Sequence, residues 1–193
     1  MQKKRLTEKG YYHNSGILLL ERHFENGKEN GVYREYQRSG TLAIELHYVN
    51  GKQHGSAREY YKTGILYRDL PYINGNLCGT LIEYHATGKF QSEIPFASNG
   101  EANGIEKWYY ESGVLHWEIL YAKGIRNGIL KEYYKSGTLM REIPYINGKE
   151  NGIVKIYCES GALKQTISYK NDETMAYMIE YIYAEYHKKP SSK

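Results

Sequence analysis

The chain has 193 residues, of which 22 are Tyr and 20 are Gly, while only 3 are Phe and 4 are Pro. Its formal net charge of +4 is spread over mixed signs, which is too weak and too dispersed to indicate a nucleic-acid-binding protein. No stretch approaches the roughly 18 apolar residues of a membrane-spanning helix, and the tyrosine-rich composition indicates a thin, partly hydrated apolar layer.

Residues 1–11 form an N-terminal segment that precedes the repeats. The stretch 1–14 is basic and polar, and the apolar run at 17–20 is too short for the apolar region of a signal peptide. The two cysteines, Cys78 and Cys158, provide no disulfide framework, which fits a reducing compartment. We therefore expect a cytoplasmic protein whose sequence contains no signal peptide.

Residues 12–170 are built from about seven copies of a 24-residue repeat. Glycine recurs every 24 residues in three series, and all three lengthen by one residue at the same place, between Gly88 and Gly100. A shared shift of this kind excludes a chance match. The three series are Gly16, Gly40, Gly64, Gly88, Gly113, Gly137 and Gly161; Gly27, Gly51, Gly75, Gly100, Gly124 and Gly148; and Gly31, Gly55, Gly79, Gly104, Gly128 and Gly152.

Between the glycines, apolar residues recur in rows that predict β-strands. Three rows lie at relative positions 0, +4 and +6, and these even offsets place them on one face of a strand, whereas a helix needs offsets near 3, 4 and 7. An aromatic row precedes them. In the repeat that begins at Tyr36, the three rows are represented by Leu42, Leu46 and Tyr48.

Two kinds of glycine turn separate the strands. Ser39-Gly40 and its equivalents lie within a repeat, and Asn50-Gly51 and its equivalents lie between repeats. Asn-Gly between apolar runs is a strong hairpin signal because both residues accept φ > 0. Turns this short make successive strands antiparallel neighbours. The sequence thus predicts an all-β fold, a single elongated and twisted antiparallel sheet of tandem hairpins.

The register within each hairpin has two solutions. A two-residue Ser-Gly loop places Arg34 opposite Glu45, and likewise Arg58 opposite Asp69, Lys107 opposite Glu118 and Lys131 opposite Glu142, as cross-strand ion pairs. A three-residue loop with glycine in a bulge instead places Tyr36 opposite Leu42 and adds the Tyr row to the apolar face. We favour the bulged loop because it makes one face consistently apolar.

The periodicity changes after Lys170, where Asn171 and Asp172 replace the glycine turn. Over 171–187 the apolar side chains fall at helical spacing, which predicts a helix that caps the last hairpin, with a partner-binding helix as the alternative. Asp172 suits the N-cap, and Pro190 lies in the tail 188–193 that follows. The apolar helix positions are Met175, Met178, Ile179, Ile182 and Tyr186.

The repeat resembles a known sequence family. The pattern Tyr-x-x-Ser-Gly-x-Leu-x-x-Glu-x-x-Tyr-x-Asn-Gly-Lys-x-x-Gly, present from Tyr36 to Gly55 and from Tyr133 to Gly152, is similar to the variant MORN repeat. The resemblance covers residues 12–170 and departs from the pattern at 97–103. It implies a repeat scaffold, in bacteria often an antitoxin-like component whose partner would be a toxin, and elsewhere a scaffold with disputed lipid binding. It supplies no catalytic residues.

Departures from the repeat mark the candidate binding residues. At the position two residues after Leu42, two repeats carry Arg68 and Arg141 and one carries Trp117. Trp108 stands where other repeats have Glu. Arg and Trp on an apolar face are typical of interface hot spots, which makes these residues a candidate protein-binding patch. The patch consists of Trp108, Tyr110, Trp117, Arg141 and Arg68, and ordinary sheet packing is the alternative.

Chemistry other than binding is poorly supported. The carboxylate row at Glu21, Glu45, Asp69, Glu93, Glu118 and Glu142 runs through every repeat and predicts an ion-pair ladder, because an active site is local. The seven histidines lack metal-ligand spacing. We therefore predict a non-enzymatic scaffold without cofactors that binds a protein. A lipid-surface module is the alternative, glycan binding is a weaker one, and an exposed edge strand allows a homodimer.

Overall fold

A computed structural model of the chain describes residues 4–178, and these residues form a single 20-stranded sheet in which all pairings are antiparallel. This confirms the predicted all-β class. The strands are β1 (Arg5–Tyr11), β2 (Leu18–Glu25), β3 (Lys28–Glu29), β4 (Gly31–Tyr36), β5 (Leu42–Val49), β6 (Lys52–Gln53), β7 (Gly55–Tyr60), β8 (Leu66–Ile73), β9 (Asn76–Leu77), β10 (Gly79–Tyr84), β11 (Phe90–Phe96), β12 (Gly104–Tyr109), β13 (Leu115–Ala122), β14 (Ile125–Arg126), β15 (Gly128–Tyr133), β16 (Leu139–Ile146), β17 (Lys149–Glu150), β18 (Gly152–Tyr157), β19 (Leu163–Lys170) and β20 (Glu173–Met178).

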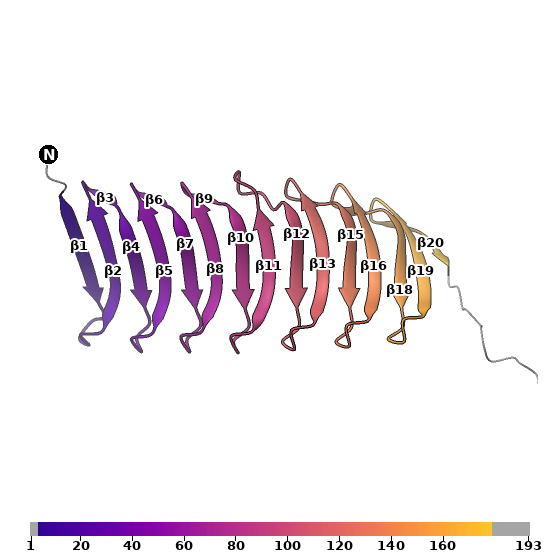
Figure 1. The fold of residues 1–193 in the computed structure, drawn as a ribbon, viewed down its shortest axis with the longest axis horizontal. Helices are drawn as coiled ribbons and strands as arrows, with labels where there is room; N and C mark the ends of the chain where they lie inside the picture. Colours follow the sequence, from indigo (N-terminus) through magenta and orange to yellow (C-terminus); the bar gives the residue numbers. More distant parts are fainter. Residues whose placement is uncertain (1–3, 179–193) are drawn as a thin grey trace, which may run out of the picture.

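The strands lie side by side in the order in which they occur in the chain (Figure 1). Seven hairpins, from β1–β2 to β18–β19, pair within themselves, and each pairs with the next. The short strands β3, β6, β9, β14 and β17 lead from one hairpin into the next. At ~4.8 Å per long strand, the array is roughly 70 Å long, and its contacts are confined to neighbouring hairpins.

The backbone adopts the turns that the glycines predict. Between repeats, Asn50 has φ 52° and Gly51 has φ 81°, as a two-residue type I′ turn requires. Within a repeat, the Gly40 amide donates to the Gln37 carbonyl at 2.8 Å, and the Gln37 amide donates to the Thr41 carbonyl at 2.8 Å. These bonds enclose a three-residue loop that ends in a left-handed glycine.

A β-bulge inside each hairpin combines the two registers that the sequence allowed. Arg34 lies opposite Glu45, but Tyr36 lies opposite Leu42, because the register shifts between Glu35 and Tyr36 and leaves Ala43 as an extra residue. The extra residue reverses the alternation of side chains beyond it. The expectation that the Leu42 row shares a face with the Leu46 and Tyr48 rows is therefore wrong, and the Leu42 and Tyr36 rows lie on the opposite face.

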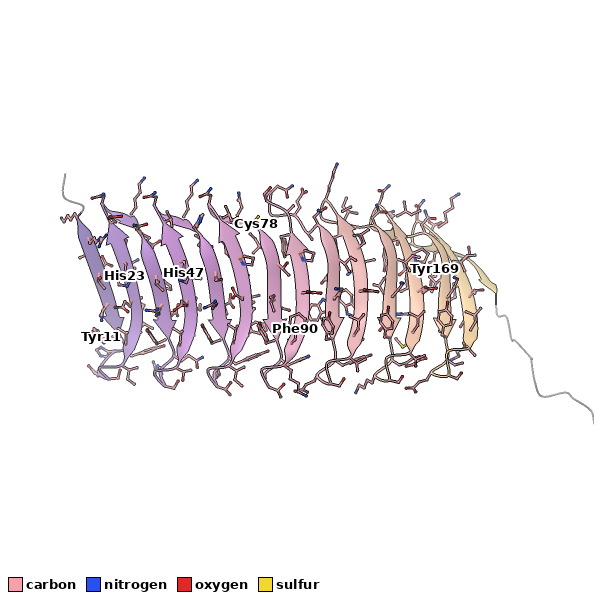
Figure 2. The ribbon with its side chains drawn as sticks, in the orientation of Figure 1. Tyr11, His23, His47, Cys78, Phe90 and Tyr169 are labelled. Atoms are coloured by element: carbon pink, nitrogen blue, oxygen red, sulfur yellow. The ribbon has the colours of Figure 1, made fainter. Side chains whose placement is uncertain are left out.

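The sheet thus has two faces of different character. We call one the tryptophan face, which carries Tyr33, Glu35, Ile44, Leu46, Tyr48 and their equivalents in other repeats. We call the other the ion-pair face, which carries Arg34, Tyr36, Leu42, Glu45 and their equivalents. In Figure 2, His23 and His47 occupy the same level of successive hairpins, and the side chains form rows across the strands.

The most deeply buried side chains all lie on the tryptophan face. Among the described residues eight side chains are buried, and all eight project from this face; Ile119 is 1% exposed and Ser92 is 0% exposed. A single-layered sheet has no second layer to cover it, so only side chains flanked by rows on both sides are enclosed. The other six are Ala57, Leu81, Glu83, Glu106, Ile143 and Val154.

Side-chain and backbone hydrogen bonds link successive hairpins at both ends. At the loop end, the Tyr61 hydroxyl donates to the Tyr84 carbonyl at 2.8 Å, and Tyr12, Tyr110 and Tyr134 repeat the contact. At the other end, the Gly75 amide donates to the Gln53 carbonyl at 2.8 Å. Most successive hairpins are therefore linked at one or both ends in addition to their strand pairing.

The ion-pair ladder is present, with local changes of partner. Arg34 pairs with Glu45 at 2.8 Å and Arg58 with Asp69 at 3.1 Å, as predicted. Lys107 aligns with Glu118 but pairs with Glu93 on the preceding hairpin at 2.8 Å. Lys131 aligns with Glu142, but Lys155 and Tyr157 bind that carboxylate.

The predicted helix at 171–187 is wrong over its first part. Asn171 and Asp172 have φ 52° and 73° and form another two-residue turn, so Asp172 is not an N-cap. The turn leads into strand β20, whose register with β19 includes Ile167 opposite Tyr177. Continuation of the sheet satisfies the backbone groups of β19, which a helix would leave unpaired. Residues 179–187 of the predicted helix, and the tail 188–193, lie outside the described residues.

Both the backbone conformation and the close packing at Gly104 disfavour any residue with a side chain. Its φ is +127°, and a Cβ atom built on it would lie 2.7 Å from Cγ of Pro95. Gly113 has a positive φ of +91° but no atom within 4 Å of a built Cβ. A side chain at either position would strain the backbone, but only at Gly104 would it also meet a close neighbour.

We predict that Gly104→Ala destabilises the sheet more than Gly113→Ala does. The strained backbone costs about 1–2 kcal/mol at either position, and the contact with Pro95 adds about 1–3 kcal/mol at Gly104 alone. Urea unfolding of the two variants measures the difference. Equal losses of unfolding free energy would show that Pro95 moves away at no cost.

Tyrosines beside the ion-pair ladder resist ionisation. Burial raises the pKa of Tyr133 to about 12, and the nearby Glu118 carboxylate, which accepts a hydrogen bond from the Tyr133 hydroxyl at 3.1 Å, contributes to the increase. Burial likewise raises the pKa of Tyr60, Tyr109 and Tyr157. The neutral phenol is thus favoured in the folded state.

We expect the protein to lose stability as pH rises from about 10 to about 12. An unfolded Tyr ionises near pH ~10, so the unfolded state releases protons in this window while folded Tyr133 retains its own, and unfolding becomes easier. Thermal melts across this range measure the fall, which should be smaller in Tyr133→Phe. A flat profile up to pH 12 would contradict the assignment.

Candidate protein-binding face

A continuous row of side chains crosses the middle of the tryptophan face. Each member lies opposite the next on a paired strand, as Arg68 does with Glu83, Ser92 with Trp108, and Trp117 with Glu132. We call these residues the central row. In spatial order they are Glu35, Ile44, Glu59, Arg68, Glu83, Ser92, Trp108, Trp117, Glu132, Arg141, Ile156 and Gln165.

Two tryptophans form the centre of this row. Trp108 on β12 and Trp117 on β13 are directly opposed and stack with ring centroids 5.7 Å apart and an interplanar angle of 18°. The indole Nε1–H of Trp108 donates to Oε1 of Glu106 at 2.7 Å. Both indoles are half-buried. The stacking and the hydrogen bond fix the rings, so a partner would meet a rigid aromatic surface.

Tyr110 supports the site but has no free hydroxyl. Its ring stacks on His116 with centroids 4.2 Å apart, and its hydroxyl donates to the Tyr133 carbonyl at 2.8 Å. Burial raises the pKa of Tyr110. The residue therefore links two hairpins and packs against His116, a residue that contacts Glu132 of the central row.

Arg68 lies in the central row at a distance from the tryptophans. It is three strand spacings from Trp108, roughly 14 Å. Its guanidinium pairs with Glu59 at 2.9 Å, and Glu83 on its other side accepts a hydrogen bond from the Ser92 hydroxyl at 3.0 Å. Four of the five predicted residues thus gather on β12–β16, and Arg68 lies at the edge of the patch.

A small hollow opens beside Trp117. It has a volume of about 170 Å³ and is lined by His116, Trp117, Arg126, Leu130, Glu132 and Arg141. Arg141 and His116 both contact the Glu132 carboxylate, His116 at 3.4 Å. The charge of Glu132 is therefore offset within the hollow.

Arg126 is a site residue that the sequence analysis missed. The same repeat position holds Glu29, Gln53, Leu77, Ala102 and Glu150 in other repeats. This departure was visible in the sequence, but only the observed pairing of β14 with β13 places Arg126 on the tryptophan face.

The ion-pair face carries a second feature that the sequence analysis missed. Ile105 on β12, Leu120 on β13, Ile129 on β15 and Ile153 on β18 are each between 43% and 57% exposed, and Pro144 on β16 lies between the last two. The equivalents of the three isoleucines in earlier hairpins are Val32, Ser56 and Thr80. We call the four exposed residues the isoleucine band.

Residues 4–178 contain no cluster of three or more potential metal ligands from His, Cys, Asp and Glu. The same part of the chain holds no helix long and apolar enough to cross a membrane. Cys78 and Cys158 are free thiols.

These features define the chain as a tandem β-hairpin repeat protein with a charged, aromatic binding face. Its sequence matches the MORN repeat variant over residues 29–50, 53–74, 102–123, 126–147 and 150–171. The five matches of 22 residues cover 110 of 193 residues, and the chain belongs to this family of repeat scaffolds. No curated protein matches the sequence.

The structure extends the repeat beyond the matched stretches. The hairpins β1–β2 and β10–β11 lie outside them and show the same internal bulge. The single inserted residue near 97–103 is accommodated in the turn after β11, where the Gly100 amide donates to the Ala97 carbonyl at 2.9 Å. The array is therefore regular even where the sequence pattern is not.

Proposed function

We propose that the protein is a non-catalytic scaffold that binds another protein through the tryptophan face, centred on Trp108 and Trp117. The observation that carries the proposal is the stacked, half-exposed tryptophan pair, of which Trp108 is hydrogen-bonded to Glu106. Members of the family are repeat modules that bind proteins or membranes.

The size of the face suits a specific complex. The eight long strands from β8 to β18 span roughly 38 by 20 Å, close to the ~800 Å² that each partner contributes to a typical interface. Aromatic and arginine anchors at the centre, with ion pairs such as Arg68–Glu59 toward one end, match the usual arrangement of hot spots and rim.

A more specific version of the proposal names the partner. The resemblance to antitoxin-like MORN proteins supports a bacterial cytoplasmic role in which the face covers a toxin. A second copy of the chain, paired through the edge strand β1, is the alternative partner, and charged residues such as Arg5 and Lys9 on that strand oppose edge pairing.

We predict that Trp117→Ala abolishes capture of the partner in an affinity pull-down from the native organism, and that Arg141→Ala weakens it. A central tryptophan is worth about 2 kcal/mol or more, at least roughly thirtyfold in affinity. Arg58→Ala, which removes an arginine from the ion-pair face, is the matched control and should leave capture unchanged.

Two results would count against the tryptophan face. Recovery of the same partner by Trp117→Ala and by the unchanged protein would move the interface elsewhere. Loss of the partner in Arg58→Ala alone would assign it to the ion-pair face.

The isoleucine band supports a second candidate function, attachment to an anionic membrane surface. Apolar side chains flanked by cations bind such surfaces through burial and charge together. Lys131, which makes no ion pair within residues 4–178, lies two residues from the half-exposed Ile129 on β15. The band and the tryptophan face lie on opposite sides of the sheet, so the two functions are separable.

Flotation with vesicles containing phosphatidylserine tests this alternative. If the band binds membrane, the chain floats at low salt and Ile129→Ser reduces flotation several-fold, because a buried isoleucine contributes about 1.5–3 kcal/mol. Val32→Ser changes the equivalent residue outside the band and should float like the unchanged protein. Absence of flotation at low salt would remove the membrane function.

A further inference from the structure

We propose that the hollow beside Trp117 binds a carboxylate group of the partner, with Arg126 as the residue that holds it. The inference rests on the proposed function and specifies it, because it assigns a chemistry to the segment that docks on the tryptophan face. The segment would present an aspartate or glutamate next to an aromatic residue.

The first argument is that the fold does not require arginine at this position. Arg126 occupies β14 opposite Tyr121, and the equivalent short strands carry Glu29, Gln53, Leu77 and Glu150 in the same backbone setting. A residue needed for packing would recur, as the tyrosines and glycines do. Arg126 is therefore available for a function outside the repeat.

The second argument is the charge of its guanidinium. Four arginines project from the strands of the tryptophan face in the described part of the chain. Arg22 pairs with Glu8 at 2.8 Å, Arg68 with Glu59 at 2.9 Å, and Arg141 with Glu132. Arg126 alone has no ion pair among residues 4–178, so an incoming carboxylate meets no competing anion on this group.

The third argument is that the guanidinium is held in place. Nε–H of Arg126 donates to the Tyr121 hydroxyl at 2.9 Å, and the guanidinium carbon lies 5.9 Å from the Tyr121 ring centroid and 5.7 Å from that of Tyr145. Both tyrosines hydrogen-bond the guanidinium as neutral phenols, so neither neutralises its charge, which is left for an anionic ligand. A planar guanidinium of fixed orientation can bind a carboxylate with two parallel hydrogen bonds.

The walls of the hollow complete the specificity. Trp117 and Leu130 form apolar sides, while Glu132 is already bound by Arg141 and His116. Arg126, Arg141 and Glu132 together give a formal charge of +1. The volume of about 170 Å³ admits one acidic side chain, and the neighbouring Trp117 ring offers a stacking surface for an adjacent aromatic group.

The test uses two blocked dipeptides as probes, N-acetyl-Phe-Glu-amide and N-acetyl-Phe-Gln-amide, titrated against the full ¹⁵N-labelled chain. NMR shifts of the Trp117 indole and Arg126 Nε–H signals report binding. We expect saturable shifts with the glutamate probe and about fivefold weaker binding with the glutamine probe, as a partly exposed ion pair predicts.

Matched variants assign the effect to Arg126. Arg126→Gln should remove the preference for glutamate. Arg126→Lys keeps the positive charge but loses the paired N–H donors of the guanidinium, and should retain only part of the preference. Arg22→Gln changes an arginine that also lies over an aromatic ring, Phe24, but is paired with Glu8, and should bind like the unchanged chain. An unchanged spectrum away from the hollow verifies folding of each variant.

The outcomes separate this inference from the proposed function. Equal affinity for the two probes, or a glutamate preference that survives Arg126→Gln, overturns the carboxylate site even if the pull-down yields a partner through Trp117. A glutamate preference that depends on Arg126, with no partner captured through Trp117, supports the site and counts against the protein-binding scaffold.

Discussion

The hydrogen bonds that join one hairpin to the next are the interaction on which the rest of the molecule depends. The sheet is a single layer, so no second sheet or helix within residues 4–178 covers either face. Each hairpin obtains its backbone partners and its lateral packing from the hairpins on both sides. The tyrosine hydroxyls that reach the carbonyl of the next repeat, as from Tyr110 to Tyr133 at 2.8 Å, strengthen this dependence because they fix the spacing at one end. Burial is consequently shallow and confined to central positions such as Ile119.

The internal β-bulge gives this thin sheet two different surfaces. Without the extra residue at Ala43, the Leu42 row would lie beside Leu46, and one face would be apolar throughout. With it, Leu42 and Tyr36 join the ion pairs, and the opposite face is left with a mixed central row of acids, arginines and tryptophans. On the ion-pair face Tyr133 is partly buried next to Glu118, and its burial and the nearby carboxylate together raise its pKa. The other side is free to vary between repeats.

Variation on a regular frame is what creates the candidate site. The residues that maintain the frame recur in every hairpin, whereas Trp108, Trp117, Arg126 and Arg141 each depart from their row and cluster on β12–β16. Other repeats form the same hairpin without these residues, so the fold does not require them. Their proximity gives a rigid aromatic centre beside a cationic hollow, two features that favour recognition of an acidic and aromatic protein segment. The isoleucine band is a similar departure on the opposite face, and it defines a second surface with a different chemistry.

The sequence by itself determined the number of repeats, the positions of the strands and turns, and most of the residues that depart from the pattern, because hairpin turns require glycine at fixed places and strands alternate with period two. It could not determine which rows share a face, since one bulged residue reverses the alternation and leaves no separate mark in the spacing. It also could not show that 173–178 continue as a strand, because Asn171 and Asp172 adopt positive φ without glycine. The pairing of β14 with β13 decided the position of Arg126. The absence of a second layer within residues 4–178 decided the exposure of Ile129. Both are properties of the assembled sheet, in which each side chain is placed by neighbours up to 24 residues away in the chain.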